Sequence, residues 1–235
     1  MIRTPSAYNV SGCGGNKSRG AAHFLMPGAA GQMGASGYLY DHDFVAGGYS
    51  SGTLITATTP DVAPAGSVYE SVSTDPVLYA NASSQMGGGG SATRARIDMQ
   101  AGDWIGEFNG NTSGTGHTSI GKLDYTDLAS KVYNGVWCLC QPQVGLWKIN
   151  TYAATVATLR DSVSTSGNGP LDHYYAVFNG ASVTVNRGDT KAAILSFGAL
   201  SAADQAETGL LMVVRRSTDY YSRMTVHNET DISKV

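Results

Sequence analysis

From about residue 53 onward, short apolar runs rich in β-branched and aromatic residues alternate with turns rich in Gly and Asn. Runs of this length and composition are typical of β-strands rather than helices. In "ATRARIDMQ", alternation puts three charged side chains on one face and Ala95, Ile97 and Met99 on the other. The predicted strands span residues 53–59, 67–73, 76–82, 92–100, 103–108, 131–140, 145–152, 155–164, 173–178, 181–186, 191–197 and 210–216.

Many short strands separated by dense turn sequences predict an all-β fold, either a sandwich or a barrel of antiparallel strands. One stretch fits a helix instead. Ser201 is a good N-cap, with Asp204 three residues later. Gly209 ends the pattern, so we expect a short helix over residues 201–208 near the C-terminus.

The first 52 residues differ in composition, because they contain eleven glycines and only scattered apolar side chains. The block is too apolar for a solvated linker and too glycine-rich for a helix. We therefore predict an extended arm over residues 1–52, followed by a β-sandwich domain over residues 53–235. The arm would pack on its own domain or on a neighbouring subunit. The expected anchoring side chains are Phe24, Leu25, Met26, Tyr38, Tyr40 and Phe44.

Charged residues make up 14% of the chain, against about 25% in an average soluble domain. A surface with so little charge does little to keep neighbouring molecules apart, which suits a protein that packs against others. The net charge is −3, and no Lys or Arg occurs from residue 20 to residue 93. The sequence therefore does not predict the basic surface that binds nucleic acid. No apolar run approaches the roughly 20 residues of a membrane span, and the N-terminus lacks a signal-peptide pattern.

The three cysteines, Cys13, Cys138 and Cys140, are too few for a disulfide framework. Cys138 and Cys140 are two residues apart, which places both on one face of a strand. A zinc site would need two further ligands at suitable spacing, and none lies nearby. We expect buried, reduced thiols and no cofactor.

Two motifs resemble catalytic or nucleotide-binding sequences without meeting their requirements. "SGCGGNKSRG" has the Lys17 and Ser18 of a phosphate-binding loop, but Ser11 and Asn16 occupy its glycine positions. "GYSSG" matches a nucleophile elbow around Ser50, yet the β-branched "TLITATTP" follows where a helix is required. We expect no enzymatic activity.

Two further candidates concern binding. Asp41 and Asp43 in "YDHDF" are oxygen ligands of the kind that Ca²⁺ takes, although a solvated polar turn between Tyr38/Tyr40 and Phe44 is the simpler explanation. Tyr174 and Tyr175 are candidates for stacking on a glycan, because a tyrosine has an apolar face and a polar edge.

The C-terminal half contains "GVWCLCQPQVGLWKINTYAATVATLRDSVSTSGNGPLDHYYAVFNG" and, further on, "KAAILSFGALSAADQAE". Over about 90 residues these stretches resemble the closing part of laminin-G-like and concanavalin A-like jelly rolls. In that family a last core strand runs into a short helix, as "ALSAADQAE" would. The resemblance implies an antiparallel jelly-roll sandwich, and such modules bind glycans or build structure on cell surfaces, secreted enzymes and phage fibres. It assigns no functional residue here.

Two functions fit these observations. The first is a non-enzymatic structural subunit of a phage or virus exterior, such as a capsid decoration, head fibre or tail component. Such a subunit would be homo-oligomeric, contact other virion proteins and assemble in the host cytoplasm. The alternative is a lectin-like carbohydrate-binding module that uses Tyr174 and Tyr175 against a host-surface glycan. Neither function needs a nucleic-acid or membrane partner.

Overall fold

The structure is a computed structural model of the chain, and it describes most of the residues after the predicted arm. Residues 1–36 lie outside the described part, and with them the predicted anchors Phe24, Leu25 and Met26 and the thiol of Cys13. The described ranges are 37–71, 77–88, 93–99, 102–111, 118–127, 132–141, 146–164 and 173–235.

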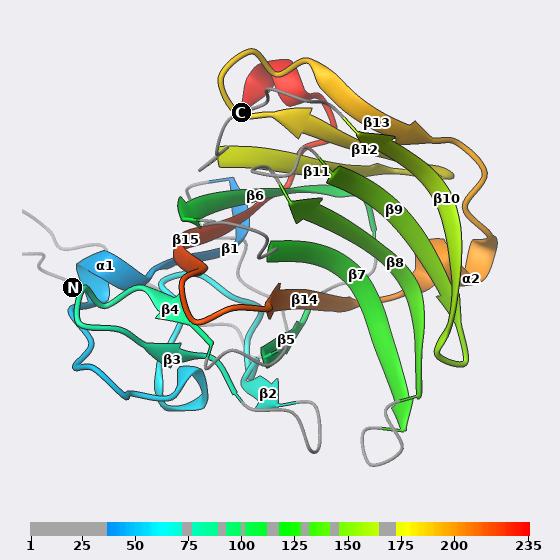
Figure 1. The fold of residues 1–235 in the computed structure, drawn as a ribbon. Coiled ribbons are helices and arrows are strands. Elements are labelled where there is room, and N and C mark those ends of the chain that lie inside the picture. Colours follow the sequence, from blue (N-terminus) through cyan, green and yellow to red (C-terminus); the bar gives the residue numbers. More distant parts are fainter. Residues whose placement is uncertain are drawn as a thin grey trace, which may run out of the picture. The chain divides into compact units, whose positions relative to one another are not determined.

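The strands form two antiparallel sheets that pack face to face (Figure 1). Sheet A contains β1 (Tyr38–Asp43), β3 (Tyr79–Ala80), β4 (Met86–Gly87), β6 (Trp104–Asn111), β11 (His173–Asn179), β12 (Ser182–Arg187), β13 (Ala193–Phe197) and β15 (Tyr220–His227). Sheet B contains β2 (Tyr69–Ser71), β5 (Thr93–Asp98), β7 (Thr118–Asp127), β8 (Val132–Gln141), β9 (Leu146–Ala153), β10 (Val156–Ser164) and β14 (Gly209–Val214).

The order of strands is β13-β12-β11-β6-β15-β4-β3 in sheet A, where β1 also pairs with β15, and β10-β9-β8-β7-β14-β5-β2 in sheet B. Among the described residues, four short helices accompany them: α1 (Phe44–Gly47), α2 (Ala202–Ala206), and the 3-10 turns η1 (Ile55–Ala57) and η3 (Ile232–Lys234). In the described part of the chain, no helix is long and apolar enough to cross a membrane. The predicted antiparallel sandwich is confirmed.

Alternate residues of both sheets point inward and form one main core, as the strand period of two requires. Trp104, Phe108 and Trp147 are among its largest buried side chains. Tyr221 links the sheets, because its hydroxyl donates to the Ser119 carbonyl at 2.7 Å. Burying a tyrosine hydroxyl without such a partner would cost the desolvation of that group.

The structure corrects two strand predictions and adds four strands, one of which is the two-residue β4. Residues 53–59 contain the η1 turn and a single bridge at Leu54 instead of a strand. β7 and β15 were not predicted from the sequence, and neither was β1. Most of the other predicted strands appear within a few residues of their expected bounds, and the 76–82 strand is reduced to the two residues of β3.

The later part of the predicted arm is not a separate element, because β1 pairs with β15 in sheet A. Tyr40 and Phe44 are fully buried in the core of the same chain. Tyr38 packs its ring edge-on against His227, 5.1 Å away. These three side chains therefore hold β1 and α1 within the sandwich.

Two local predictions are confirmed. The helix near the C-terminus is α2, and Ser201 and Asp204 form a capping box at its start. Cys138 and Cys140 are buried free thiols on the inner face of β8. Burial raises the pKa of Cys138 to about 12, so this thiol is inert at neutral pH.

Candidate binding site

A pocket of about 410 Å³ opens between the β9–β10 hairpin and α2, and we call it the α2 pocket. Its lining combines amide, hydroxyl, guanidinium, carboxylate and phenol groups. The lining residues are Asn134, Thr151, Tyr152, Ala153, Thr158, Arg160, Ser201, Ala203, Asp204 and Glu207.

The hairpin that forms one wall turns through two residues with positive φ, Ala154 at 46° and Thr155 at 74°. A two-residue turn of this kind normally takes Gly or Asn at such positions, and a β-branched threonine there is strained. The Asn134 side chain supports the turn by accepting a hydrogen bond from the Ala154 N–H at 2.9 Å. Strain of this type is tolerated where surrounding contacts fix the backbone, which is common beside ligand sites.

Arg160 reaches the pocket from an irregularity in strand pairing. The β9–β10 register shifts between Leu159 and Asp161, so Arg160 is the extra residue of a β-bulge. Bulges redirect a side chain out of the regular alternation. The Arg160 Nε donates to the Thr151 hydroxyl at 2.7 Å, and its guanidinium lies 5.4 Å from the centre of the Phe197 ring. Arg160 is thus exposed to solvent yet held in position at the pocket wall.

The opposite wall comes from α2 and the residue that follows it. The Asp204 carboxylate accepts hydrogen bonds from the Ser201 hydroxyl at 2.7 Å and from the Ser201 N–H at 3.1 Å. Glu207, which is half-buried, supplies a second carboxylate. The pocket therefore presents one cation and two carboxylates, together with neutral donors and acceptors.

Tyr152 is a lining residue whose ring belongs to the outer face of sheet B. It is half-buried, and its ring centre lies 5.5 Å from that of Trp137 on the neighbouring strand, with 32° between the ring planes. Trp137 belongs to a small cluster on the face of sheet B that points away from sheet A. Tyr152 is common to the pocket and to this cluster, so the two adjoin.

The predicted stacking residues lie elsewhere. Tyr174 is fully buried on the inner face of β11 and stacks on Phe108, with 4.8 Å between ring centres. Tyr175 is on the outer face of sheet A, where Ile232 and Val235 pack beside it. Both tyrosines belong to a strand flanked by β6 and β12, not to a loop, so neither offers a free face to a sugar.

The aspartates of the Ca²⁺ candidate have protein partners. Asp41 forms a two-point ion pair with Arg223, with N–O distances of 2.8 and 2.6 Å. Asp43 caps α1 by accepting from the Ala46 N–H at 2.8 Å. In the described ranges, no group of three or more His, Cys, Asp or Glu side chains is arranged to hold a metal ion.

Ser50 lies on an exposed loop between α1 and η1. A nucleophile elbow needs a strand before the serine and a helix after it. That context is missing around Ser50, as the sequence indicated.

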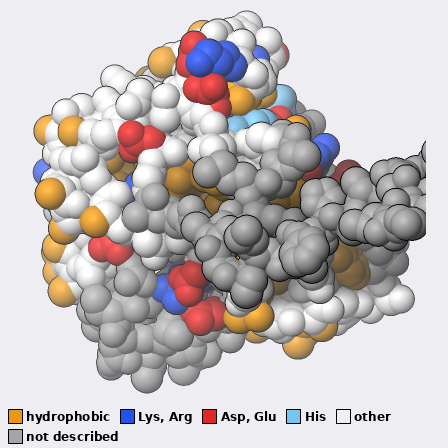
Figure 2. Space-filling view, turned by 180° about the vertical axis from the view of Figure 1, so that it is seen from behind, with side chains coloured by type: hydrophobic (Ala, Val, Ile, Leu, Met, Phe, Trp, Pro, Cys, Tyr) orange, Lys and Arg blue, Asp and Glu red, His pale blue; other side chains and the backbone are white. Residues whose placement is uncertain are grey.

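A second polar cluster lies on the outer face of sheet A. Glu107 on β6 accepts from His173 Nε2 at 2.7 Å and from His227 Nε2 at 2.6 Å. Burial alone would raise the pKa of Glu107, but these hydrogen bonds outweigh it and hold the pKa well below its ordinary value. Figure 2 shows histidine side chains at the surface on this side of the molecule, beside acidic and basic groups. Both carboxylate oxygens are occupied, so the cluster joins β6, β11 and β15.

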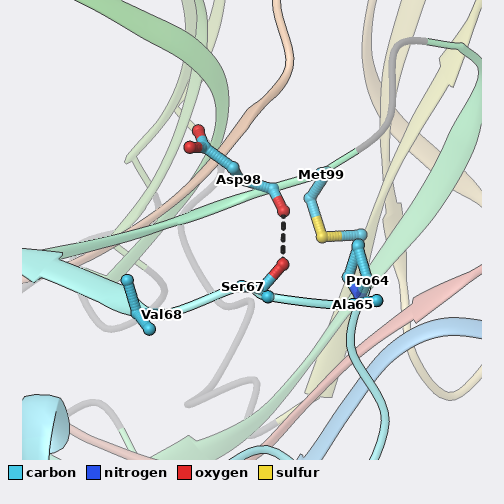
Figure 3. Close-up of a pocket in the computed structure, with 7 residues that line it drawn as sticks. Pro64, Ala65, Ser67, Val68, Asp98 and Met99 are labelled. Atoms are coloured by element: carbon cyan, nitrogen blue, oxygen red, sulfur yellow. Dashed lines mark hydrogen bonds between the residues drawn. The ribbon is translucent and has the colours of Figure 1, made fainter. Parts of the chain in front are cut away.

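A third candidate is a hollow of about 420 Å³ between the Pro64–Val68 turn and Asp98–Met99. The Ser67 hydroxyl donates to the Asp98 carbonyl at 3.0 Å. Figure 3 shows Met99 reaching toward Pro64, while the Asp98 carboxylate points away from the turn. Ser67 and Asp98 are the polar side chains of its lining, and the Ser67 hydroxyl is already engaged with the Asp98 carbonyl.

Comparison with known proteins gives no family assignment. No family model matches the sequence, and no curated protein matches it. Among solved structures, the chain is similar to the CBM2 module of the evolved Dit of Lactobacillus casei BL23 phage J-1 (TM-score 0.49, 10% identity, 83% of this chain and 96% of that chain). It is also similar to the Emp46p carbohydrate recognition domain (0.48, 10%, 78% and 98%) and to the carbohydrate-binding module CBM66 of Bacillus subtilis (0.42, 13%, 68% and 92%).

Jelly-roll sandwiches of the concanavalin A-like type are thus the structures that the chain resembles, in line with the resemblance in its C-terminal half. At these identities and TM-scores, the likenesses carry no information about ligand or activity.

Proposed function

We propose that the protein is a carbohydrate-binding module and that the α2 pocket holds the sugar. The observation that carries this proposal is the position of Arg160, fixed at a bulge and facing a pocket whose other wall supplies Asp204 and Glu207. A sugar hydroxyl both donates and accepts a hydrogen bond. Guanidinium groups only donate and carboxylates only accept, so a site with both can bind each hydroxyl in two ways.

The charge of the pocket favours neutral sugars. One arginine faces two carboxylates, which disfavours a uronic or sialic acid, since its own carboxylate would lie beside two like charges. Tyr152 adds an amphipathic ring of the kind that packs against the apolar face of a pyranose. Two or three hydrogen bonds to charged groups, each contributing about 1.5–3 kcal/mol, suit the weak binding of a single sugar.

We propose binding without hydrolysis. Most glycoside hydrolases place two carboxyl groups on either side of the scissile bond. In the α2 pocket one carboxylate, that of Asp204, is engaged by both the N–H and the hydroxyl of Ser201. It serves the helix cap and is poorly placed to act as a nucleophile or general acid.

The test is calorimetric titration of sugars selected on a glycan array. Arg160→Ala should weaken binding at least tenfold, because it removes the positioned donor. Arg216→Ala is the matched control, since Arg216 is an exposed arginine outside the pocket. The proposal fails if no glycan binds, or if both substitutions have the same effect.

We also propose that the module is part of the exterior of a phage or virus particle, as an oligomeric structural subunit. The supporting observation is β10, the last described strand of sheet B. It is nine residues long, and Val156 and Leu159 on it are 69% and 53% exposed. A long, exposed apolar edge strand is a ready surface for pairing with another chain.

Light scattering across a concentration series tests this second proposal. A discrete oligomer that Leu159→Lys converts to monomer would support packing through β10. A monomer at every concentration would count against it, while leaving the carbohydrate proposal intact.

A further inference from the structure

The outer face of sheet B carries a row of side chains that runs across its strands. Directly paired residues share a face, so the register places Asn150, Trp137, Gly121, Leu211 and Arg96 in one line. A methyl group at Gly121 would lie 3.4 Å from the Leu211 Cβ and 3.0 Å from a backbone oxygen. A side chain at Gly121 would therefore crowd its neighbours in this row.

Trp137 and Arg94 meet above the middle of the sheet. They belong to β8 and β5, and the strands β7 and β14 lie between them. The Arg94 guanidinium carbon is nonetheless 5.6 Å from the centre of the indole ring, so both side chains extend across the sheet. Leu211 and Val213 on β14 are fully buried in the same cluster. Arg94 therefore lies over one face of the indole.

Within the described ranges, the Trp137 indole also lacks a hydrogen-bond acceptor for its N–H group. Trp137 is 7% exposed, and its Nε1–H is buried with no hydrogen-bond partner among the residues that the structure describes. The same donor lacks a partner in this part of the chain in Trp104 and Trp147, but those two rings are in the main core, whereas Trp137 is in the cluster on the outer face of sheet B. A ligand oxygen beside the ring would supply the missing acceptor.

We propose that Trp137 is a second sugar subsite, next to the α2 pocket, and that the ligand is a neutral linear oligosaccharide. This inference rests on the carbohydrate-binding function proposed above. One sugar occupies the α2 pocket, and the chain continues past Tyr152 to the indole, 5.5 Å from it ring to ring. Arg94 moves off the indole as the next sugar stacks there, exchanging a cation–π contact for a stacking contact. The site therefore selects chain length as well as sugar type.

One part of the test needs no ligand. Trp104 and Trp147 are 1% and 0% exposed, so a quencher such as acrylamide reports mainly on Trp137. Arg94→Ala should increase quenching at least twofold relative to the unsubstituted protein. Quenching that stays the same would show that Arg94 does not cover the ring, and would overturn the proposal.

The second part compares chain lengths by fluorescence and calorimetry. The probes are glucose with cellotetraose, mannose with β-1,4-mannotetraose, and galactose with β-1,4-galactotetraose. We expect one tetrasaccharide to bind at least tenfold more tightly than its monosaccharide and to change the Trp137 emission. Trp137→Leu should abolish that gain in affinity while leaving monosaccharide binding within twofold. Arg94→Ala should strengthen tetrasaccharide binding several-fold.

The outcomes separate the two proposals. Equal affinity for monosaccharide and tetrasaccharide, or a Trp137→Leu variant that keeps the full gain, overturns the second subsite alone. Absence of binding by all six sugars and on the glycan array overturns the carbohydrate-binding function and this inference together. Thermal unfolding of each variant identifies any that fail to fold, and Trp137→Phe then replaces Trp137→Leu.

Discussion

Glu107→Gln is predicted to destabilise the sandwich, because one carboxylate joins three strands of sheet A. Glu107 accepts from His173 and His227, and also from the Asn109 amide at 3.2 Å. The glutamine side chain has nearly the same shape, but it replaces one acceptor oxygen by an N–H₂ group. That group would be directed at the Nε2 of one imidazole, which can no longer donate there, so a hydrogen bond to a charged acceptor is lost.

The expected cost follows from burial. The Glu107 side chain is 17% exposed, so solvent can only partly replace the lost bond. A hydrogen bond to a charged group contributes about 1.5–3 kcal/mol, and we expect a loss of about 2 kcal/mol at pH 7. For a domain of this size that corresponds to a fall in Tm of roughly 4–8 °C.

The effect should depend on pH with a definite sign. The folded-state pKa of Glu107 is below its ordinary value of 4.5. The stabilisation is therefore fully present above pH 4.5 and declines as the pH falls further, because the unfolded chain takes up the proton first. The difference between the two proteins should shrink on acidification.

Urea unfolding at pH 7 and at pH 3.5, followed by tryptophan fluorescence, measures the loss of stability at neutral pH and its change on acidification. Asp189→Asn is the control, because it breaks an exposed ion pair with Arg187 and should change little. Equal stability of Glu107→Gln and the unsubstituted protein at pH 7 would refute the reasoning. So would a difference that grows toward low pH.

Three further predictions concern other buried positions. Burial lowers the pKa of His42 to about 4 from 6.5, so stability should rise with pH across that window, and an NMR titration of its ring should show the low midpoint. Gly135→Ala should cost at least about 2 kcal/mol in urea unfolding, since φ is +114° and the new methyl would lie 2.3 Å from the Lys122 carbonyl oxygen. Cys138 and Cys140 should resist a thiol reagent until denaturant is added, as read by peptide mass spectrometry; fast labelling of the native protein would contradict their burial.

The fold could be read from the sequence wherever a strand shows one apolar face. In β5 the inward residues Ala95 and Ile97 are buried, as alternation predicted. The N-terminal cap of α2 was also predictable, because Ser201 and Asp204 form a local motif whose partners are three residues apart. Local sequence was sufficient in both cases.

β7 was missed because its inward face carries a charged side chain. Lys122 is buried, and its ammonium group donates to the carbonyls of Gly102 and Gln205, both at 2.7 Å. Those acceptors are distant in sequence, so nothing near Lys122 distinguishes it from a loop lysine. The strand predicted over residues 53–59 was wrong for the opposite reason. Their β-branched composition favours a strand, but residues 55–57 form the η1 turn in the folded chain.

The binding site was not predictable from local sequence for a related reason. The α2 pocket draws on residues from Asn134 to Glu207, which only the folded sandwich brings together. Arg160 owes its position to a bulge in strand pairing, and a bulge has no reliable sequence signature. The tyrosines at 174 and 175 were chosen for their residue type, and their burial depends on the sheet around them.

The most direct test of the central claim is a two-dimensional ¹H–¹⁵N NMR titration with the best ligand from a glycan array. We expect saturable shifts in the β9–β10 turn, at Asn134 and in residues 201–207, joined by Trp137 and Arg94 when the ligand is an oligosaccharide, and we expect all of them to be lost in Arg160→Ala. Shifts that cluster on another face, such as around Glu107 or the Pro64–Val68 turn, would contradict the assignment of the sugar to the α2 pocket. A spectrum unchanged by every glycan tested would contradict carbohydrate binding itself.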